Sequence, residues 1–378
     1  MSHLDAPLPV DRPDLLSIRA ALRRLLVRFG PEYWRTCDSQ RAFPSEFMRT
    51  MAEGGYLGTL IPEAHGGLGL GPSVASVIVE EINRAGGDGA VVNAQMAICG
   101  TLVREGTEEQ KAYLPQIAAG TTRLLTVAAT EPDSGADMSH LESVARRQGQ
   151  DWVVDAKKVF ISLAEHTDLM ILLVRTEEGP TLFLLDLREF GTEIEIRPVD
   201  MIANRMTTML FIDGLCVPDR CRLGSVGGGL RGLMKGFAPR RVLAAAESIG
   251  NARFFLDKSV QHAIDRRTFH RPIGQNQGVQ YPLAQAYAKV EAADLMRWDA
   301  IRYLEDGRDG GGRSALAKIL ASEAAWETAR AALTTFGGWG LASEVHVERK
   351  LRDATIFVFN NMLLSYVAEK VLGMPKSF

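Results

Sequence analysis

Residues that could do chemistry fall into three groups in this sequence: glycine-rich turns, scattered histidines and cysteines, and short segments that mix hydroxyl, aromatic and cationic residues. The run Ile61–Gly71 lacks the Lys-Ser/Thr pair of a phosphate loop and is interpreted as a turn between helices. The histidines have no partner at ligand spacing, and the cysteines match no zinc or redox pattern, so no metal site is predicted. Without a Gly-x-Ser-x-Gly motif, a hydrolase triad has no anchor.

The third group consists of four segments that follow one another along the chain and carry a resemblance to one known family. They are Thr130–Asp137 (TEPDSGAD), Lys158–Ser162 (KVFIS), Arg266–Ile273 (RRTFHRPI) with Gln277, and Phe336–Gly340 (FGGWG) followed by Arg352–Ala354 (RDA). In these segments the chain resembles the acyl-CoA dehydrogenases. The resemblance extends from Pro62 to Ala354.

The resemblance implies FAD as the cofactor. Thr130 and Ser162 offer short polar groups and Phe160 a stacking surface for the isoalloxazine ring, while Arg266 and the Gly337-Gly338 turn offer a cation and backbone donors for the pyrophosphate. In the family, the arginine and glycine elements reach the FAD of a neighbouring subunit, so a homodimer or homotetramer is implied. The implied cofactor-binding set is Ala129, Thr130, Phe160, Ser162, Arg266, Thr268, Phe269, Gln277, Thr334, Gly337 and Gly338.

The residue that usually carries the family's chemistry is replaced. In acyl-CoA dehydrogenases a glutamate nine residues after the arginine of RDA removes the α-proton beside the thioester carbonyl, and Gly-Thr follow it. The ninth residue after Arg352 is Asn361, followed by Met362-Leu363. Because an amide is essentially non-basic at neutral pH, Asn361 cannot act as that base.

The family's second base position is also occupied by a residue that is not a base. Some members place the glutamate immediately before an arginine on the first helix of the last domain, where this chain has Arg240-Arg241. Glu247 follows roughly 10 Å along that helix and is weighed as a relocated base against an ordinary solvated or ion-paired glutamate. Arg241 matches the family arginine and is expected to contact substrate. Ala136 replaces a serine that helps to hold the ligand, and Thr334 replaces a glutamine near FAD.

These residues predict an FAD-dependent oxidoreductase of acyl-CoA dehydrogenase type that acts on the CH–CH group of an acyl-CoA or carrier-bound acyl thioester, by non-standard chemistry because of Asn361. One alternative is an O2-using flavin oxygenase on a specialised thioester, in which Arg240 or Asn361 orients an anionic intermediate. Another is a non-catalytic subunit that completes the FAD site of a related chain, as part of a hetero-oligomer. The electron acceptor is not determined by the sequence.

Composition narrows the partners. The net charge of -3, with 46% hydrophobic and 24% charged residues, offers no broad attraction to nucleic acid or anionic membranes. The first ten residues, MSHLDAPLPV, contain an acidic residue and prolines but no apolar core, unlike a signal or transit peptide. Together with four cysteines expected to be reduced, this composition predicts a cytoplasmic protein without nucleic-acid or membrane partners.

The elements that must position these residues change along the chain. Apolar residues recur at helical spacing up to about Gly120, short β-rich runs separated by turn signals follow to about Leu223, and long Ala-rich helices complete the chain. We therefore predict an α+β protein with an N-terminal helical domain (1–120), a middle β-barrel or antiparallel sheet (121–225) and a C-terminal four-helix bundle (226–378). The predicted helices of the bundle are Val242–Ala263, Val279–Leu304, Ser314–Phe336 and a last stretch from Val347 towards Val371.

Overall fold

The structure is a computed structural model that describes residues 12–135, 138 and 140–376. The α+β class is confirmed, and the chain forms two compact units. The first unit contains the chain up to Ala42, then Gly71–Ala90, and the chain from Ala238 onward; the second contains Phe43–Leu70 and Val91–Phe237. The domain borders at 120 and 225 stay predictions.

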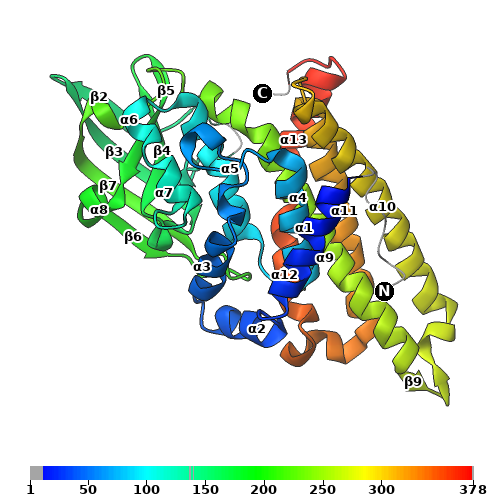
Figure 1. Cartoon of the computed structure of the whole chain (residues 1–378). Coiled ribbons are helices and arrows are strands. Elements are labelled where there is room, and N and C mark those ends of the chain that lie inside the picture. Colours follow the sequence, from blue (N-terminus) through cyan, green and yellow to red (C-terminus); the bar gives the residue numbers. More distant parts are fainter. Residues whose placement is uncertain (1–11, 136–137, 139, 377–378) are drawn as a thin grey trace. The chain divides into compact units, whose positions relative to one another are not determined.

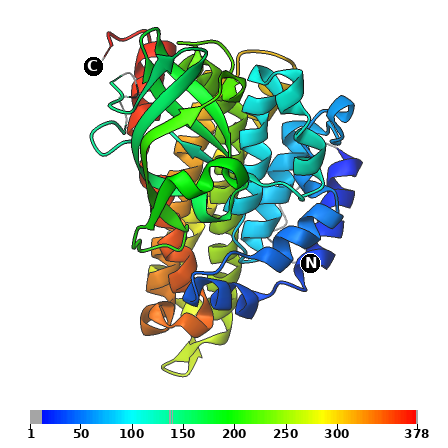
Figure 2. The same cartoon turned by 90° about the vertical axis from the view of Figure 1, so that its left-hand side faces the viewer.

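The second unit is built around a curved sheet (Figures 1 and 2). Its eight strands follow the path β6-β7-β3-β2-β4-β5-β8, with β1 paired to β4 beside that path. The strands are β1 (Leu124–Ala128), β2 (Val144–Gln148), β3 (Asp151–Ser162), β4 (Leu169–Thr176), β5 (Gly179–Asp186), β6 (Ile194–Pro198), β7 (Thr207–Val217) and β8 (Arg222–Leu223).

The prediction of a purely antiparallel sheet was wrong for two pairings. β1 runs parallel to β4, and β2 pairs parallel with β4 at its end, while the other neighbours are antiparallel. The first pairing follows from the order of the strands along the chain. The β2–β3 hairpin lies between β1 and β4 in sequence, and after it the chain enters β4 in the same direction as β1. Local residue patterns do not encode such a pairing.

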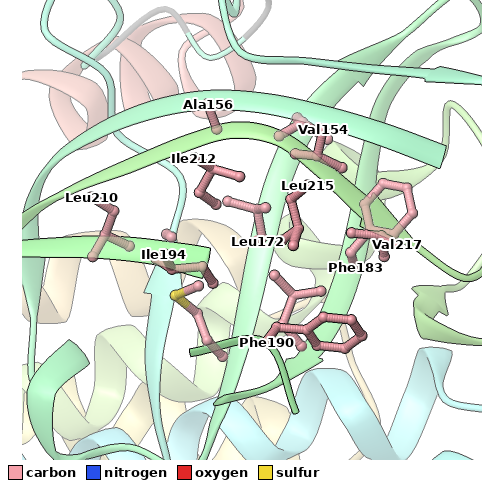
Figure 3. Packing of buried hydrophobic residues seen from close by; sticks show 14 of the residues in the cluster. Val154, Ala156, Leu172, Phe183, Phe190, Ile194, Leu210, Ile212, Leu215 and Val217 are labelled. Carbon is pink, nitrogen blue, oxygen red and sulfur yellow. The ribbon is translucent and has the colours of Figure 1, made fainter. Parts of the chain in front are cut away.

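β4 explains why this unit has two cores. Its residues alternate between the faces, and nearly all are buried, as expected for a strand covered on both sides. Met170, Leu172 and Val174 belong to the core inside the curve of the sheet, where Phe190 of the short helix α8 (Leu187–Phe190) also lies (Figure 3). The alternate residues of β4 pack with α5 (Ala90–Glu105) and α7 (Leu114–Ala118) on the other face.

The glycine-rich run Ile61–Gly71 is a turn, as predicted. It includes the short 3-10 helix η2 (Glu63–His65) and leads into α4 (Gly71–Arg84). Gly67 is required here, because a Cβ at this position would lie 2.1 Å from the Ile61 carbonyl oxygen. The unit also contains α3 (Ser45–Glu53), η1 (Tyr56–Gly58), α6 (Glu108–Lys111) and the 3-10 turns η3 (Ala164–His166), η4 (Gly191–Glu193) and η5 (Asp219–Cys221).

The first unit is helical, and its long helices lie side by side (Figures 1 and 2). Three of the four helices predicted for the bundle are present: two are slightly longer than expected, and the first begins at Gly229 rather than at Val242. The unit contains α1 (Pro13–Leu26), α2 (Pro31–Ser39), α4, α9 (Gly229–Asp265, from Ala238), α10 (Gln277–Glu305), α11 (Gly311–Phe336), α12 (Val347–Thr355), α13 (Asn361–Tyr366) and the β9–β10 hairpin (Arg267–Thr268 and Arg271–Pro272).

A buried cluster of charges joins four of these helices. Glu80 of α4 is fully buried and is paired with Arg253 of α9, with Arg297 of α10 and, at 3.6 Å, with Arg19 of α1. Burial alone would raise the pKa of Glu80, but the arginines, Arg253 first, hold it far below its ordinary value. Removing Glu80 would take away the carboxylate that the three buried arginines share, so the cluster favours one arrangement of these four helices.

The fourth predicted helix is interrupted, which corrects the continuous stretch expected from Val347 towards Val371. α12 ends at Thr355, a short turn η9 (Ile356–Val358) follows, and α13 begins at Asn361, continued by the π-type turn η10 (Val367–Val371). Lys318 of α11 provides the reason, because its ammonium binds the carbonyls of Phe357 and Phe359, which would otherwise accept helical hydrogen bonds. Within the part of the chain that the structure describes, no helix has the length and apolar character needed to cross a bilayer.

Candidate functional site

On the second unit, a bulge in β3 presents Phe160. Lys158 pairs with Leu210 and Ile161 with Thr208, so two residues of β3 lie opposite one residue of β7. Phe160 has a φ of 55° and a side chain that is 59% exposed. A left-handed backbone costs a residue other than glycine about 1–2 kcal/mol, and such strain collects at functional sites. The bulge holds an aromatic ring in the open at the end of the strand.

The hydroxyl residues predicted to accompany Phe160 lie beside the bulge. The Val159 N–H donates to the Thr130 carbonyl at 3.0 Å, which joins the segment after β1 to β3. The Ser162 carbonyl accepts the Thr126 hydroxyl at 3.0 Å, while its side chain is exposed. Ala129 and Thr130 are half-buried. The structure therefore brings together four predicted cofactor residues from segments about thirty positions apart.

The other predicted cofactor residues lie on the first unit, where a stacked pair joins two of their elements. His262 of α9 and Phe336 of α11 stack with their ring centroids 4.1 Å apart. Arg266 follows His262 by one helical turn, and Gly337 follows Phe336 directly. The stacking of His262 on Phe336 therefore brings the start of the β9–β10 hairpin close to the Gly337-Gly338 turn, although the two lie far apart in sequence.

These elements offer exposed polar groups to a ligand or another chain. Arg266, Thr268, Phe269, Gln277 and Thr334 are exposed, Phe269 at 93%. Gly337 ends α11 with φ 60° and ψ -137°, and an added Cβ at Gly337 or Gly338 would meet no atom within 4 Å. The Thr334 hydroxyl instead donates to the carbonyls of its own helix, at Arg330 and Ala331.

Asn361, at the expected position of the catalytic glutamate, is the first residue of α13 and is exposed. The same helix receives Arg241 from α9: the guanidinium lies 4.9 Å from the centre of the Tyr366 ring, and Nη1 donates to the Gly311 carbonyl at 3.5 Å. The structure thus joins one predicted substrate-binding residue to the helix that begins at the position of the missing base.

The residue that fixes the start of this helix was not predicted. Lys318 Nζ donates to the carbonyl of Phe357 at 2.9 Å and to Asn360 Oδ1 at 2.7 Å, and Asn360 Nδ2 donates to Ser322 Oγ at 3.0 Å. Burial lowers the pKa of Lys318 to about 8. The only signal in the sequence was the polar pair Asn360-Asn361 after an apolar run, and it does not reveal a partner more than forty residues away.

The remaining predicted site residues differ in exposure. Arg240 is exposed on α9, whereas Glu247 is only 1% exposed. Ala136, predicted to contact substrate, lies outside the described residues. Across residues 12–135, 138 and 140–376, no group of three or more histidine, cysteine, aspartate or glutamate side chains is arranged to hold a metal ion.

Comparison with known proteins agrees with this fold over the whole chain. Family models of the N-terminal, middle and C-terminal domains of acyl-CoA dehydrogenases match residues 12–121, 126–213 and 227–359. The chain is 30% identical to acyl-CoA dehydrogenase FadE12 of Mycobacterium tuberculosis over 383 residues, 98% of each chain. It is 32% identical to glutaryl-CoA dehydrogenase of Desulfococcus multivorans over 379 residues, 95% of this chain and 96% of the relative. A solved glutaryl-CoA dehydrogenase in complex with glutaryl-CoA is 28% identical, with a TM-score of 0.90 and 98% of both chains covered.

The matches to all three domains, together with the similarity to named acyl-CoA dehydrogenases, define the class as an FAD-dependent oxidoreductase acting on CH–CH groups. The chain belongs to the acyl-CoA dehydrogenase family. The residues present fit the cofactor: the open Phe160 ring suits an aromatic ring system, and the unobstructed backbone at Gly337-Gly338 suits close approach by a phosphate.

Proposed function

We propose that this enzyme acts on an acyl-CoA or a carrier-bound acyl thioester by a reaction that does not depend on a carboxylate base at residue 361. The observation that carries the proposal is Asn361, an amide on the first turn of α13. A side chain that cannot take a proton at neutral pH cannot perform the family's usual α-proton removal. Relatives named glutaryl-CoA dehydrogenase and cyclohex-1-ene-1-carbonyl-CoA dehydrogenase support a thioester substrate.

FAD, when bound, supplies a two-electron redox centre. In the proposed site Phe160 would provide a stacking surface for the flavin, and Thr130 and Ser162 would provide polar groups for it. Ala129 lies beside them. Arg241, whose guanidinium lies over the Tyr366 ring, would orient a polar or anionic part of the substrate near α13. Glu247 remains an alternative base; its burial would keep a carboxyl group out of bulk water and so requires a route for the proton.

We propose that the cofactor-binding residues of the first unit serve a neighbouring subunit. Arg266, Thr268 and Phe269 form an exposed hairpin arm, with Gln277 beyond it, and Gly337-Gly338 an exposed turn near its base. A cation and free backbone groups are suited to a pyrophosphate. This arrangement supports a homodimer or homotetramer. From its composition, we also propose that the protein is located in the cytoplasm.

The test is to purify the protein, confirm bound FAD, and add a panel of acyl-CoAs without oxygen while recording flavin absorbance near ~450 nm. The proposal predicts that bleaching by simple saturated acyl-CoAs is absent, or slower by about 100-fold or more than a carboxylate-assisted reaction allows. Rapid bleaching that survives Glu247→Gln would overturn it. Rapid bleaching that disappears in Glu247→Gln would identify Glu247 as the relocated base.

An O2-using oxygenase is the second candidate, and Arg240 favours it. This exposed cation lies next to Arg241, at the position where some relatives carry a base, and it could orient an anionic species during reaction with O2. Thioester-dependent O2 consumption by the chemically reduced enzyme would support an oxygenase. If a homo-oligomer with FAD bound neither bleaches nor consumes O2, co-purification with a related chain that has an intact glutamate would support a helper subunit.

A further inference from the structure

A buried ion pair fastens the end of β1 to the bulge of β3. Lys158 Nζ lies 2.7 Å from Glu131 Oε1, and the two side chains are 0% and 2% exposed. Lys158 Nζ also donates to the Ala129 carbonyl at 3.2 Å. Glu131 accepts the N–H groups of Glu142 at 2.6 Å and Ser143 at 3.1 Å.

Burying the two charges of this pair carries a desolvation free energy that apolar side chains of similar size would not have. Burial lowers the pKa of Lys158 to about 8, although Glu131 works against that shift. Burial alone would raise the pKa of Glu131, but the hydrogen bonds from Lys158 and Ser143 bring it below its ordinary value. A desolvated pair contributes little net stability when compared with apolar replacements, but its directional bonds specify one arrangement of the two segments.

That arrangement concerns the residues proposed to contact the flavin. Ala129 and Thr130 lie directly before Glu131, and Phe160 lies two residues after Lys158. The Val159 N–H bonds the Thr130 carbonyl at 3.0 Å, so the ion pair and this backbone bond together hold the strained bulge against the segment after β1. Without the pair, the Val159–Thr130 backbone bond would be left as the link between the bulge and the Ala129–Glu131 segment, while the pairing of β3 with β7 would stay in place.

We propose that Lys158 and Glu131 are positioning residues for FAD, which keep Ala129, Thr130 and Phe160 in the arrangement that receives the flavin. Neither side chain contacts the cofactor; both act by fixing the strand ends that do. The inference rests on the flavin position proposed above. It predicts that loss of the Lys158–Glu131 pair weakens FAD binding by more than the accompanying loss of stability explains.

The test compares full-length Lys158→Met with Val154→Ala, which removes buried atoms from the same strand without touching the pair. FAD is titrated into each apoprotein, and the dissociation constant is measured by quenching of flavin fluorescence, with the melting temperature of each apoprotein as the measure of stability. Loss of the charge-assisted bonds predicts affinity weaker by about tenfold or more in Lys158→Met. Val154→Ala should lower the melting temperature with a much smaller change in affinity.

Hydrogen exchange of the apoprotein gives a second readout, because the Val159 amide should lose protection in Lys158→Met and keep it in Val154→Ala. If Lys158→Met does not fold, Glu131→Gln, which removes the charge and keeps the shape, takes its place. Unchanged FAD affinity, or equal weakening in Val154→Ala, overturns the inference. Unchanged affinity in Phe160→Ala would instead show that the proposed flavin position is wrong, and absence of thioester bleaching would leave the inference standing.

Discussion

At the scale of single residues, the proposed reaction depends on Asn361. Its position relative to Arg352 matches that of a glutamate in related enzymes, and it begins α13 as an exposed residue. Lys318 and Asn360 fix the backbone immediately before it. The backbone at residue 361 is therefore held by contacts that do not involve its side chain, so residue 361 can be substituted with little change of structure.

Asn361→Glu is expected to add a base at this position. If the rest of the pocket suits dehydrogenation, the rate of flavin bleaching by an acyl-CoA should rise by about 100-fold or more, since general-base catalysis typically contributes that much. The measurement is anaerobic stopped-flow absorbance. Asn361→Gln, of similar size but without basicity, is the matched control. Equal rates in the Glu and Gln variants would mean that substrate does not approach residue 361 in a dehydrogenation geometry.

Lys318 gives a prediction about pH. Burial lowers its pKa from 10.5 to about 8, so between these pH values the unfolded chain keeps a proton that the folded chain has released. The contribution of this group to the free energy of unfolding is therefore lowest below pH 8 and rises towards pH 10.5.

Lys318→Met should remove this rise, which is about 3 kcal/mol for a shift from 10.5 to about 8. The check is chemical denaturation of both proteins at several pH values across the window. Lys289→Met, which changes a lysine that is 55% exposed, is the control and should keep the wild-type slope. A slope that is the same in Lys318→Met and wild type would refute the assignment.

At the scale of elements, two segments depart from regular geometry where the site is expected. The bulge of β3 exposes Phe160, and the β9–β10 hairpin turns through Phe269 and His270, with φ values of 50° and 67°. Two-residue hairpin turns with positive φ favour glycine or asparagine. In the resembling motif, the position of His270 is a glycine, so the hairpin keeps a glycine conformation without the glycine.

His270→Gly is therefore expected to stabilise the hairpin. Relief of the left-handed strain is worth about 1 kcal/mol, reduced by the greater flexibility of glycine in the unfolded chain. The measurement is the difference in unfolding free energy, with His270→Ala as control, because alanine keeps the steric penalty. A His270→Gly protein less stable than His270→Ala would show that the flexibility of glycine in the unfolded chain outweighs the relieved strain, and would contradict the prediction.

At the scale of the whole molecule, the proposed cofactor residues divide between two compact units. Thr130, Phe160 and Ser162 belong to the second unit, and Arg266 and Gly337 belong to the first. If the latter serve the FAD of a partner subunit, as we propose, each complete site contains residues from two chains. Symmetric oligomers make this division testable, because variants on different chains can complement one another.

Co-expressed Phe160→Ala and Arg266→Ala chains should form mixed dimers with one complete site in each. We expect each variant alone to bind FAD weakly and the mixed dimer to bind about half the wild-type amount, because one of its two sites then combines intact residues from both chains. Differently tagged chains allow purification of the mixed dimer, and absorbance gives the FAD content. Pairing the double variant with wild type leaves no complete site and is the control; equal FAD content in both mixtures would contradict the shared site.

The order of short motifs was enough to predict the class and the cofactor, because the chemistry of residues such as Phe160 and Arg266 depends on type and spacing. The replacement of the base by Asn361 stays a prediction. Helix and strand positions also followed from periodicity, which reflects local geometry. The parallel β1–β4 pairing, the break before α13 and the Lys158–Glu131 pair depended on the tertiary structure. Each depends on contacts between residues far apart in sequence, and the free energy of a buried charge or a strand pairing is set by partners that no local pattern specifies.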